Sequence, residues 1–104
     1  MLTLALQNTI GPGSDKQVAT LFAGPGRRLV QITLRQRARL AAHTSPVPIT
    51  IQCVAGAGTL TSTTLATAVA LRPGTLVTLE AGEMHEVNAA PEVSILLTQF
   101  TASE

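Results

Sequence analysis

The sequence predicts one all-β domain, a sandwich or barrel with little or no helix. Strand-like runs of roughly 5–9 residues recur between Gly, Pro, Asn and Ser turn signals, while no helical periodicity extends far enough to define a helix. The apolar 45% of the chain consists mainly of Leu, Val, Ile and Ala, and Thr is frequent. Branched side chains of this kind pack well on a pleated surface. A length of 104 residues fits a single domain, 1–104.

The expected elements follow the turn signals along the chain. Residues 1–16 are a short apolar start and a polar Gly-Pro-Gly-Ser-Asp segment, expected to form an arm or edge strand. Glycine and proline turns then separate about nine expected strands. The strands are expected at residues 17–23, 28–35, 38–43, 49–54, 59–62, 64–71, 75–79, 85–89 and 93–100.

Alternation assigns faces within these strands, because successive side chains point to opposite sides. In the second strand Leu29, Gln31 and Thr33 share one face, and Val30, Ile32 and Leu34 share the other. Two later strands together offer a mostly apolar lining, which suits either a ligand pocket or a plain core. Its expected members are Ile49, Ile51, Cys53, His85 and Val87.

Composition excludes several classes of function. A net charge of +1, with no Trp or Tyr, is unlike a nucleic-acid binder, which clusters basic charge and stacks bases on aromatic rings. No apolar run is long enough for a membrane-spanning helix, and the first residues lack the basic start of a signal peptide. We therefore expect no nucleic acid, no membrane and a cytoplasmic location. The single cysteine excludes an internal disulfide.

Low charge suggests self-association. Only 12% of the residues are charged, about half the usual share, so few groups solvate the exterior. We expect one face to be buried against a second copy, in a homodimer.

The segment from Leu71 to His85 is the most informative part of the chain. Pro73-Gly74 starts a short apolar strand, Ala-Gly-Glu ends it, and His85 opens the next strand. The other histidine of the chain, His43, ends an earlier expected strand. If the fold brings the two together, they define a site.

These residues resemble the second motif of the cupin superfamily, G-x5-P-x-G-x2-H-x3-N. Gly74, Gly82 and His85 match its spacing, whereas Glu80 replaces the proline and Ala89 the asparagine. The resemblance is to small, single-domain, RmlC-like cupins and covers residues 27–100. It implies a double-stranded β-helix, or jelly-roll barrel.

The first cupin motif, G-x5-H-x-H-x3-E-x6-G, is matched by His43 and Gly56. Arg37 stands at its first glycine, Ser45 at its second histidine and Ile49 at its glutamate. In metal-binding cupins three histidines and one glutamate hold a divalent metal. The resemblance thus implies Zn, Ni, Mn or Fe with His43 and His85 as partial ligands, although metal sites usually take three or four protein ligands.

Other reactive residues have plain structural interpretations. Cys53 lies in an apolar strand and is expected to be a buried small hydrophobe rather than a nucleophile. Arg35, Arg37 and Arg39 alternate and are expected to form a solvated basic stripe, with a carboxylate- or phosphate-binding edge as the alternative.

Near the second motif, Glu83 is expected to be solvated and Glu86 to point outward. Glu83 lies in a turn, and the alternation that turns His85 inward turns Glu86 outward.

Three hypotheses for function remain. The first is a protein that binds a small organic molecule in the barrel near His43 and His85. The second is a metal-dependent enzyme of the dioxygenase or isomerase type. The third is a structural or dimerisation module, in which both histidines are hydrogen-bonded relics of a metal site.

Overall fold

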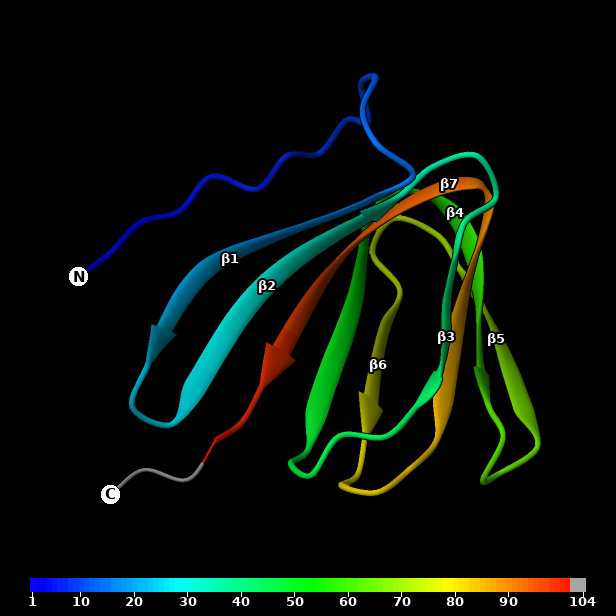
Figure 1. The fold of residues 1–104 in the computed structure, drawn as a ribbon. Helices are drawn as coiled ribbons and strands as arrows, with labels where there is room; N and C mark the ends of the chain where they lie inside the picture. Colours follow the sequence, from blue (N-terminus) through cyan, green and yellow to red (C-terminus); the bar gives the residue numbers. More distant parts are fainter. Residues whose placement is uncertain (102–104) are drawn as a thin grey trace.

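The computed structural model describes residues 1–101, and its regular elements are seven β-strands (Figure 1). No helix occurs in that part of the chain, so none there is long and apolar enough to cross a membrane. The all-β prediction is confirmed. The strands are β1 (Lys16–Gly24), β2 (Arg27–Leu34), β3 (Arg39–His43), β4 (Ile49–Ser62), β5 (Thr67–Leu71), β6 (Leu76–Leu79) and β7 (His85–Gln99).

The strands form two layers because the two longest strands bend. The second half of β7 lies between β2 and the first half of β4, which also pairs with β6. The first half of β7 lies between β3 and the second half of β4, which also pairs with β5. All these pairings are antiparallel, and β1 adds to the edge of β2. The result is the expected jelly-roll arrangement (Figure 1). The barrel is closed at the end where β4 and β7 bend, and it is open at the opposite end, where both strands begin and finish.

The bend in β4 depends on glycine. Gly56 has φ +76°, and a Cβ there would collide with the carbonyl oxygen of Glu92 on β7. A Cβ on Gly58 would lie 2.5 Å from the carbonyl oxygen of Asn88. These glycines therefore allow close approach between two strands rather than ending one.

The expected number of strands was wrong for this reason. The expected strands at 49–54 and 59–62 are both parts of β4, and those at 85–89 and 93–100 both fall on β7. Because hydrogen bonding continues through both bends with shifts of register, seven strands form in the described part of the chain instead of nine. β5 begins at Thr67 rather than residue 64, because a turn precedes it.

The expected basic stripe of Arg35, Arg37 and Arg39 was also wrong. Gln36 and Arg37 have φ of 56° and 57°, so the chain turns there instead of continuing as a strand. Arg35 donates from Nε to the carbonyl oxygen of Gly11 and from Nη1 to that of Ser14, both at 2.8 Å. It therefore holds the N-terminal segment against the end of β2.

The core lies between the two layers, on the faces that alternation predicted. On β2 the side chains of Val30, Ile32 and Leu34 point into the core, while Gln31 lies on the outer face beneath the N-terminal arm. The core is composed of Val30, Ile32, Leu34, Ile49, Ile51, Cys53, Leu60, Leu71, Leu79, Val87, Ala89, Val93 and Ile95.

Candidate functional site

A β-bulge in β3 brings the two histidines together. Leu40 pairs with Val87, and the next pair along the ladder is His43 with His85. Two residues of β3, 41 and 42, therefore stand opposite Glu86 alone. Cross-strand partners share a face, so this extra residue turns His43 to the side of the sheet that carries His85. The two ring centroids lie 4.3 Å apart with the planes tilted by 58°.

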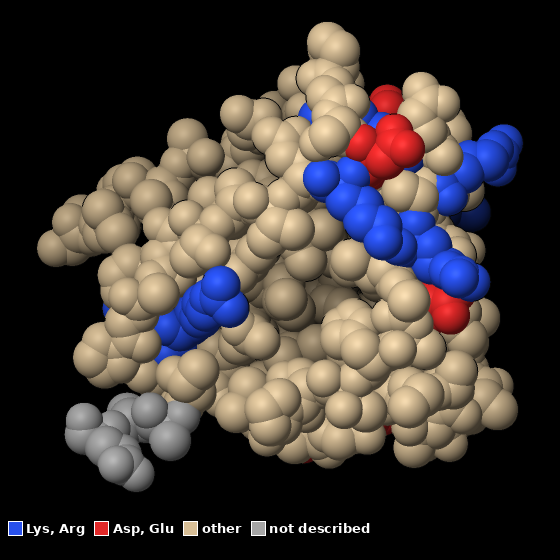
Figure 2. Space-filling model, in the orientation of Figure 1, with Lys and Arg blue, Asp and Glu red and all other residues tan. Residues whose placement is uncertain are grey.

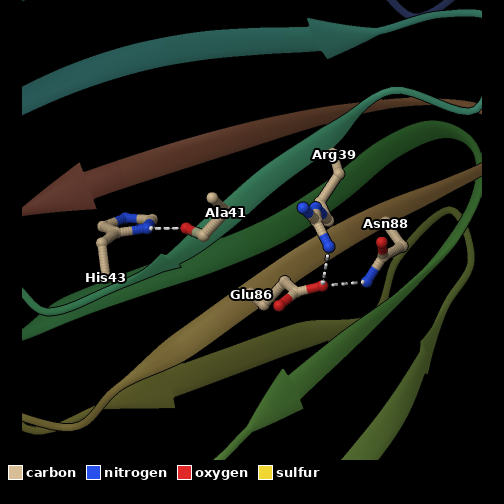
Figure 3. Close-up of polar contacts among 5 residues, drawn as sticks. All are labelled: Arg39, Ala41, His43, Glu86 and Asn88. Atoms are coloured by element: carbon tan, nitrogen blue, oxygen red, sulfur yellow. Dashed lines mark hydrogen bonds and ion pairs between the residues drawn. The ribbon is translucent and has the colours of Figure 1, made fainter.

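Backbone carbonyls orient both rings. Nδ1 of His43 donates to the carbonyl oxygen of Ala41 at 2.8 Å (Figure 3), and Nδ1 of His85 donates to that of Glu83 at 3.0 Å. A carbonyl oxygen can only accept, so Nδ1 carries the hydrogen in each ring. In the neutral form each Nε2 then presents a lone pair.

The two histidines differ in exposure. His43 is exposed, whereas His85 is 2% exposed. Burial is the main cause that lowers the pKa of His85, and the nearby His43 lowers it further. The hydrogen bond to the carbonyl of Glu83 and the charge of the Glu83 carboxylate act in the opposite direction and raise the pKa. Within residues 1–101 no buried side-chain nitrogen or oxygen lacks a hydrogen-bond partner. Nε2 of His85 makes no such bond, so solvent reaches it.

Ser62 and Glu83 complete the surroundings of His85. Ser62 is the partner of His85 on β4 and is 4% exposed. Its Oγ donates to Oε2 of Glu83 at 3.4 Å and accepts from the amide of Leu65 at 3.3 Å. The prediction of a solvated Glu83 was therefore only partly right, because its side chain is half-buried. Ser62 was missed, although alternation from Leu60 would have placed it on the inner face.

The apolar residues expected to line a pocket belong to the core. Ile49, Ile51, Cys53 and Val87 are each at most 2% exposed. Burial raises the pKa of the Cys53 thiol, and its Sγ donates to the carbonyl oxygen of Ala55 at 3.6 Å. Cys53 is thus a buried small hydrophobe, as predicted. Contact between these four residues and a ligand stays a prediction.

The opposite face of the same sheet is polar. Oε1 of Glu86 lies 3.8 Å from Nη1 of Arg39 and accepts from Nδ2 of Asn88 at 3.0 Å (Figure 3). Glu86 therefore faces away from the histidine pair, as predicted. The Arg39 side chain is exposed and Glu86 is half-buried, and an ion pair this long at the surface adds little to stability.

Two concave regions could accept a ligand. Figure 2 shows a hollow in the middle of one face, between the β2 side of the molecule and β3, with basic side chains on two sides. A separate cavity of about 160 Å³ lies on the outer face of β1 and β2, beneath the N-terminal arm. In that cavity Gln31 already donates to the carbonyl of Gln7 and to Ser94, and Gln17 accepts from Arg35. Its polar groups hold the arm in place, so the hollow between the layers is the better candidate site.

The set of metal ligands found in metal-binding cupins is incomplete in this chain. Ser45 uses its Oγ to donate to the carbonyl oxygen of Val47 at 2.8 Å, and Ile49 is in the core. In residues 1–101 no group of three or more His, Cys, Asp and Glu side chains could hold a metal. Two imidazoles do not fit a metal centre built from three or four protein ligands.

Comparison with solved structures identifies the fold. A cupin superfamily protein from Desulfitobacterium hafniense matches with a TM-score of 0.79 at 9% identity, over 88% of this chain and 83% of that one. An RmlC-like cupin from Desulfovibrio desulfuricans matches with a TM-score of 0.77 at 13% identity, over 94% and 97%. The DMSP lyase DddQ from Ruegeria pomeroyi matches with a TM-score of 0.76 at 15% identity, over 84% of this chain and 47% of that one. No protein-family model and no curated protein matches the sequence.

The molecule is therefore a small cupin-fold protein, and the jelly roll that the two motifs implied is confirmed. Identities this low establish the fold alone, and one fold serves many chemistries.

Proposed function

We propose that this protein binds a small organic molecule in the hollow between its two layers, against His43 and His85. The observation that carries the proposal is the histidine pair: two rings 4.3 Å apart, each with Nδ1 tied to a backbone carbonyl. Such fixed orientation leaves both Nε2 atoms available to a ligand.

The chemistry of the pair favours a ligand with hydrogen-bond donors. Burial lowers the pKa of His85, which favours its neutral form near pH 7. A neutral Nε2 accepts from a hydroxyl or N–H group. The apolar core behind the pair supports an apolar body next to that polar group, the usual composition of a small-molecule site.

The test is a fragment screen by saturation-transfer NMR with small acids, amides, alcohols and phenols. We expect fragments that bind the wild type to bind His43→Ala at least about tenfold more weakly, the loss expected for one hydrogen bond and its packing. His43 is exposed, so this variant should keep the fold. Thr44→Ala, an exposed neighbour outside the pair, is the control and should bind normally. Equal binding to His43→Ala and the wild type would refute the proposal.

A second candidate is a weak site for a divalent transition metal. Histidines that bind metals commonly donate their other N–H to a carbonyl, as both rings do here. Such a metal would need water or ligand oxygens to complete its coordination. Elemental analysis of untagged protein after incubation with Zn, Ni, Mn or Fe decides the matter. Less than about 0.1 metal per chain would exclude a useful site.

The remaining alternative is a structural module without a ligand. It predicts that no fragment binds and that His43→Ala behaves like the parent in every screen. The same NMR experiment therefore separates it from the first proposal.

A further inference from the structure

Arg28 lies on the inner face of β2, at the open end of the barrel. It pairs with Gln99 of β7 in the ladder that continues through Val30, Ile32 and Leu34. Those three side chains point into the core. Since alternate residues of a strand share a face, the side chain of Arg28 leaves the strand on the same side. It is exposed, so it lies at the rim of the barrel rather than within the core.

Neutral side chains hold the Arg28 guanidinium. Nη1 donates to Oε1 of Gln99 at 3.3 Å, and Nη2 donates to Oγ1 of Thr20 at 3.2 Å. In the described part of the chain the ion pair that forms is Arg39 with Glu86, and no carboxylate lies within ion-pair distance of Arg28. Among residues 1–101, no carboxylate therefore neutralises the charge of Arg28, and the guanidinium has further N–H groups that could donate to a ligand.

The course of β7 relates Arg28 to the histidines. β7 begins at His85 in one layer, bends at the closed end and finishes at Gln99 in the other layer (Figure 1). Both ends of β7 thus lie at the open end of the barrel. The hollow in Figure 2 lies between these layers, with basic side chains on two sides.

We infer that Arg28 is the anion-binding group of this site, so that the ligand is a small organic carboxylate. The inference rests on the proposed function, which supplies the histidine end of the ligand. A guanidinium fork matches the two oxygens of a carboxylate, and a single unneutralised positive charge suits a monoanion. Packed sheets lie about 10 Å apart, so a ligand that reaches both sides separates its carboxylate from its hydrogen-bond donor by several bonds.

Arg27 provides a matched control. It is the neighbouring residue in sequence with the same charge, but its guanidinium stacks on the ring of Phe22 at 4.5 Å, and alternation turns it away from the inner face. Arg27→Gln and Arg28→Gln therefore change the net charge equally. A general effect of charge would appear in both variants, whereas loss of a specific contact would appear in one.

The experiment compares hydroxy acids, which carry both a carboxylate and a distant hydroxyl donor, with their primary amides: 4-hydroxybenzoate with 4-hydroxybenzamide, 4-hydroxyphenylacetate with 4-hydroxyphenylacetamide, and 6-hydroxyhexanoate with 6-hydroxyhexanamide. Affinities are measured by NMR titration for the wild type, both glutamine variants and Arg28→Lys. We expect the wild type and Arg27→Gln to prefer carboxylates. Arg28→Gln should lose that preference, with carboxylate affinity reduced at least about tenfold and amide affinity unchanged. Arg28→Lys should recover part of it, because lysine keeps the charge without the fork.

The outcomes separate this inference from the proposed function. If amides bind as well as carboxylates and His43→Ala weakens both, the anion subsite is refuted and the ligand site stands. If Arg27→Gln and Arg28→Gln lose carboxylate affinity equally, the effect is one of net charge and the inference is overturned. If none of these carboxylates binds the wild type at millimolar concentration while other fragments bind in a way that depends on His43, the anion subsite is refuted and the ligand site stands. Matching thermal melts of Arg28→Gln and wild type confirm that the variant is folded.

Discussion

Replacing Gly56 with alanine should destabilise the protein by about 2–5 kcal/mol. The backbone there has φ +76°, a left-handed conformation that costs an L-residue about 1–2 kcal/mol. The new Cβ would also meet the carbonyl oxygen of Glu92 on the paired strand. Relieving that collision requires β4 and β7 to separate at the closed end, at the cost of overpacking, about 1–3 kcal/mol.

Gly74→Ala is the matched control for this prediction. Gly74 also has positive φ, +96°, but a Cβ there would meet nothing within 4 Å. Gly74→Ala should therefore lower the free energy of unfolding only by the conformational cost, about 1–2 kcal/mol. Urea unfolding followed by far-UV circular dichroism measures both variants against the wild type. If the two alanine variants lose the same free energy of unfolding, the close approach at Gly56 does not constrain the bend, and the reasoning is wrong.

Three further predictions follow from burial and exposure. Because the pKa of His85 is lowered in the folded state, the unfolded chain takes up a proton more readily; the free energy of unfolding should fall as pH drops below about 6.5 and level off below the folded pKa. Urea titrations between pH 8 and 5 should show a weaker decline in His85→Gln, and an equal decline in both proteins contradicts the assignment. Cys53 should resist a thiol reagent in the native protein and react fully in urea, so rapid native labelling would show that the core opens. The protein should be a homodimer by light scattering, and glutamate at the exposed arm residues Leu4 and Leu6 should shift it to monomer; a wild-type monomer at micromolar concentration refutes this.

Period-two alternation is a local property, and what it predicted was confirmed. It assigned the two faces of β2 and turned Glu86 away from His85, because a strand in a two-layered barrel has one side in the core. Glycine was less informative. Gly56 and Gly58 lie between the expected strands at 49–54 and 59–62, where glycine predicted a turn. They instead permit close contact of β4 with β7, a strand distant in sequence.

The candidate site was predicted in part. The cupin motifs identified His43 and His85, but the bulge at residues 41–42 that turns His43 inward has no sequence signal of its own. Arg28 was overlooked although alternation from Val30 would have placed it on the inner face. The prediction of a basic stripe was wrong because Gln36 and Arg37 adopt left-handed conformations, which their residue types do not favour.

The course of β7 also determines how ligand binding would couple to unfolding. One strand supplies His85 at its start and the partner of Arg28, Gln99, at its end, so neither half of the site survives if β7 leaves the barrel. A bound ligand should then slow hydrogen exchange of those β7 amides that open only in global unfolding, by the factor set by its saturation. Exchange by local fraying of the N-terminal arm should be unaffected. Ligand binding at the open end would thus protect the amides of the whole barrel from exchange through global unfolding.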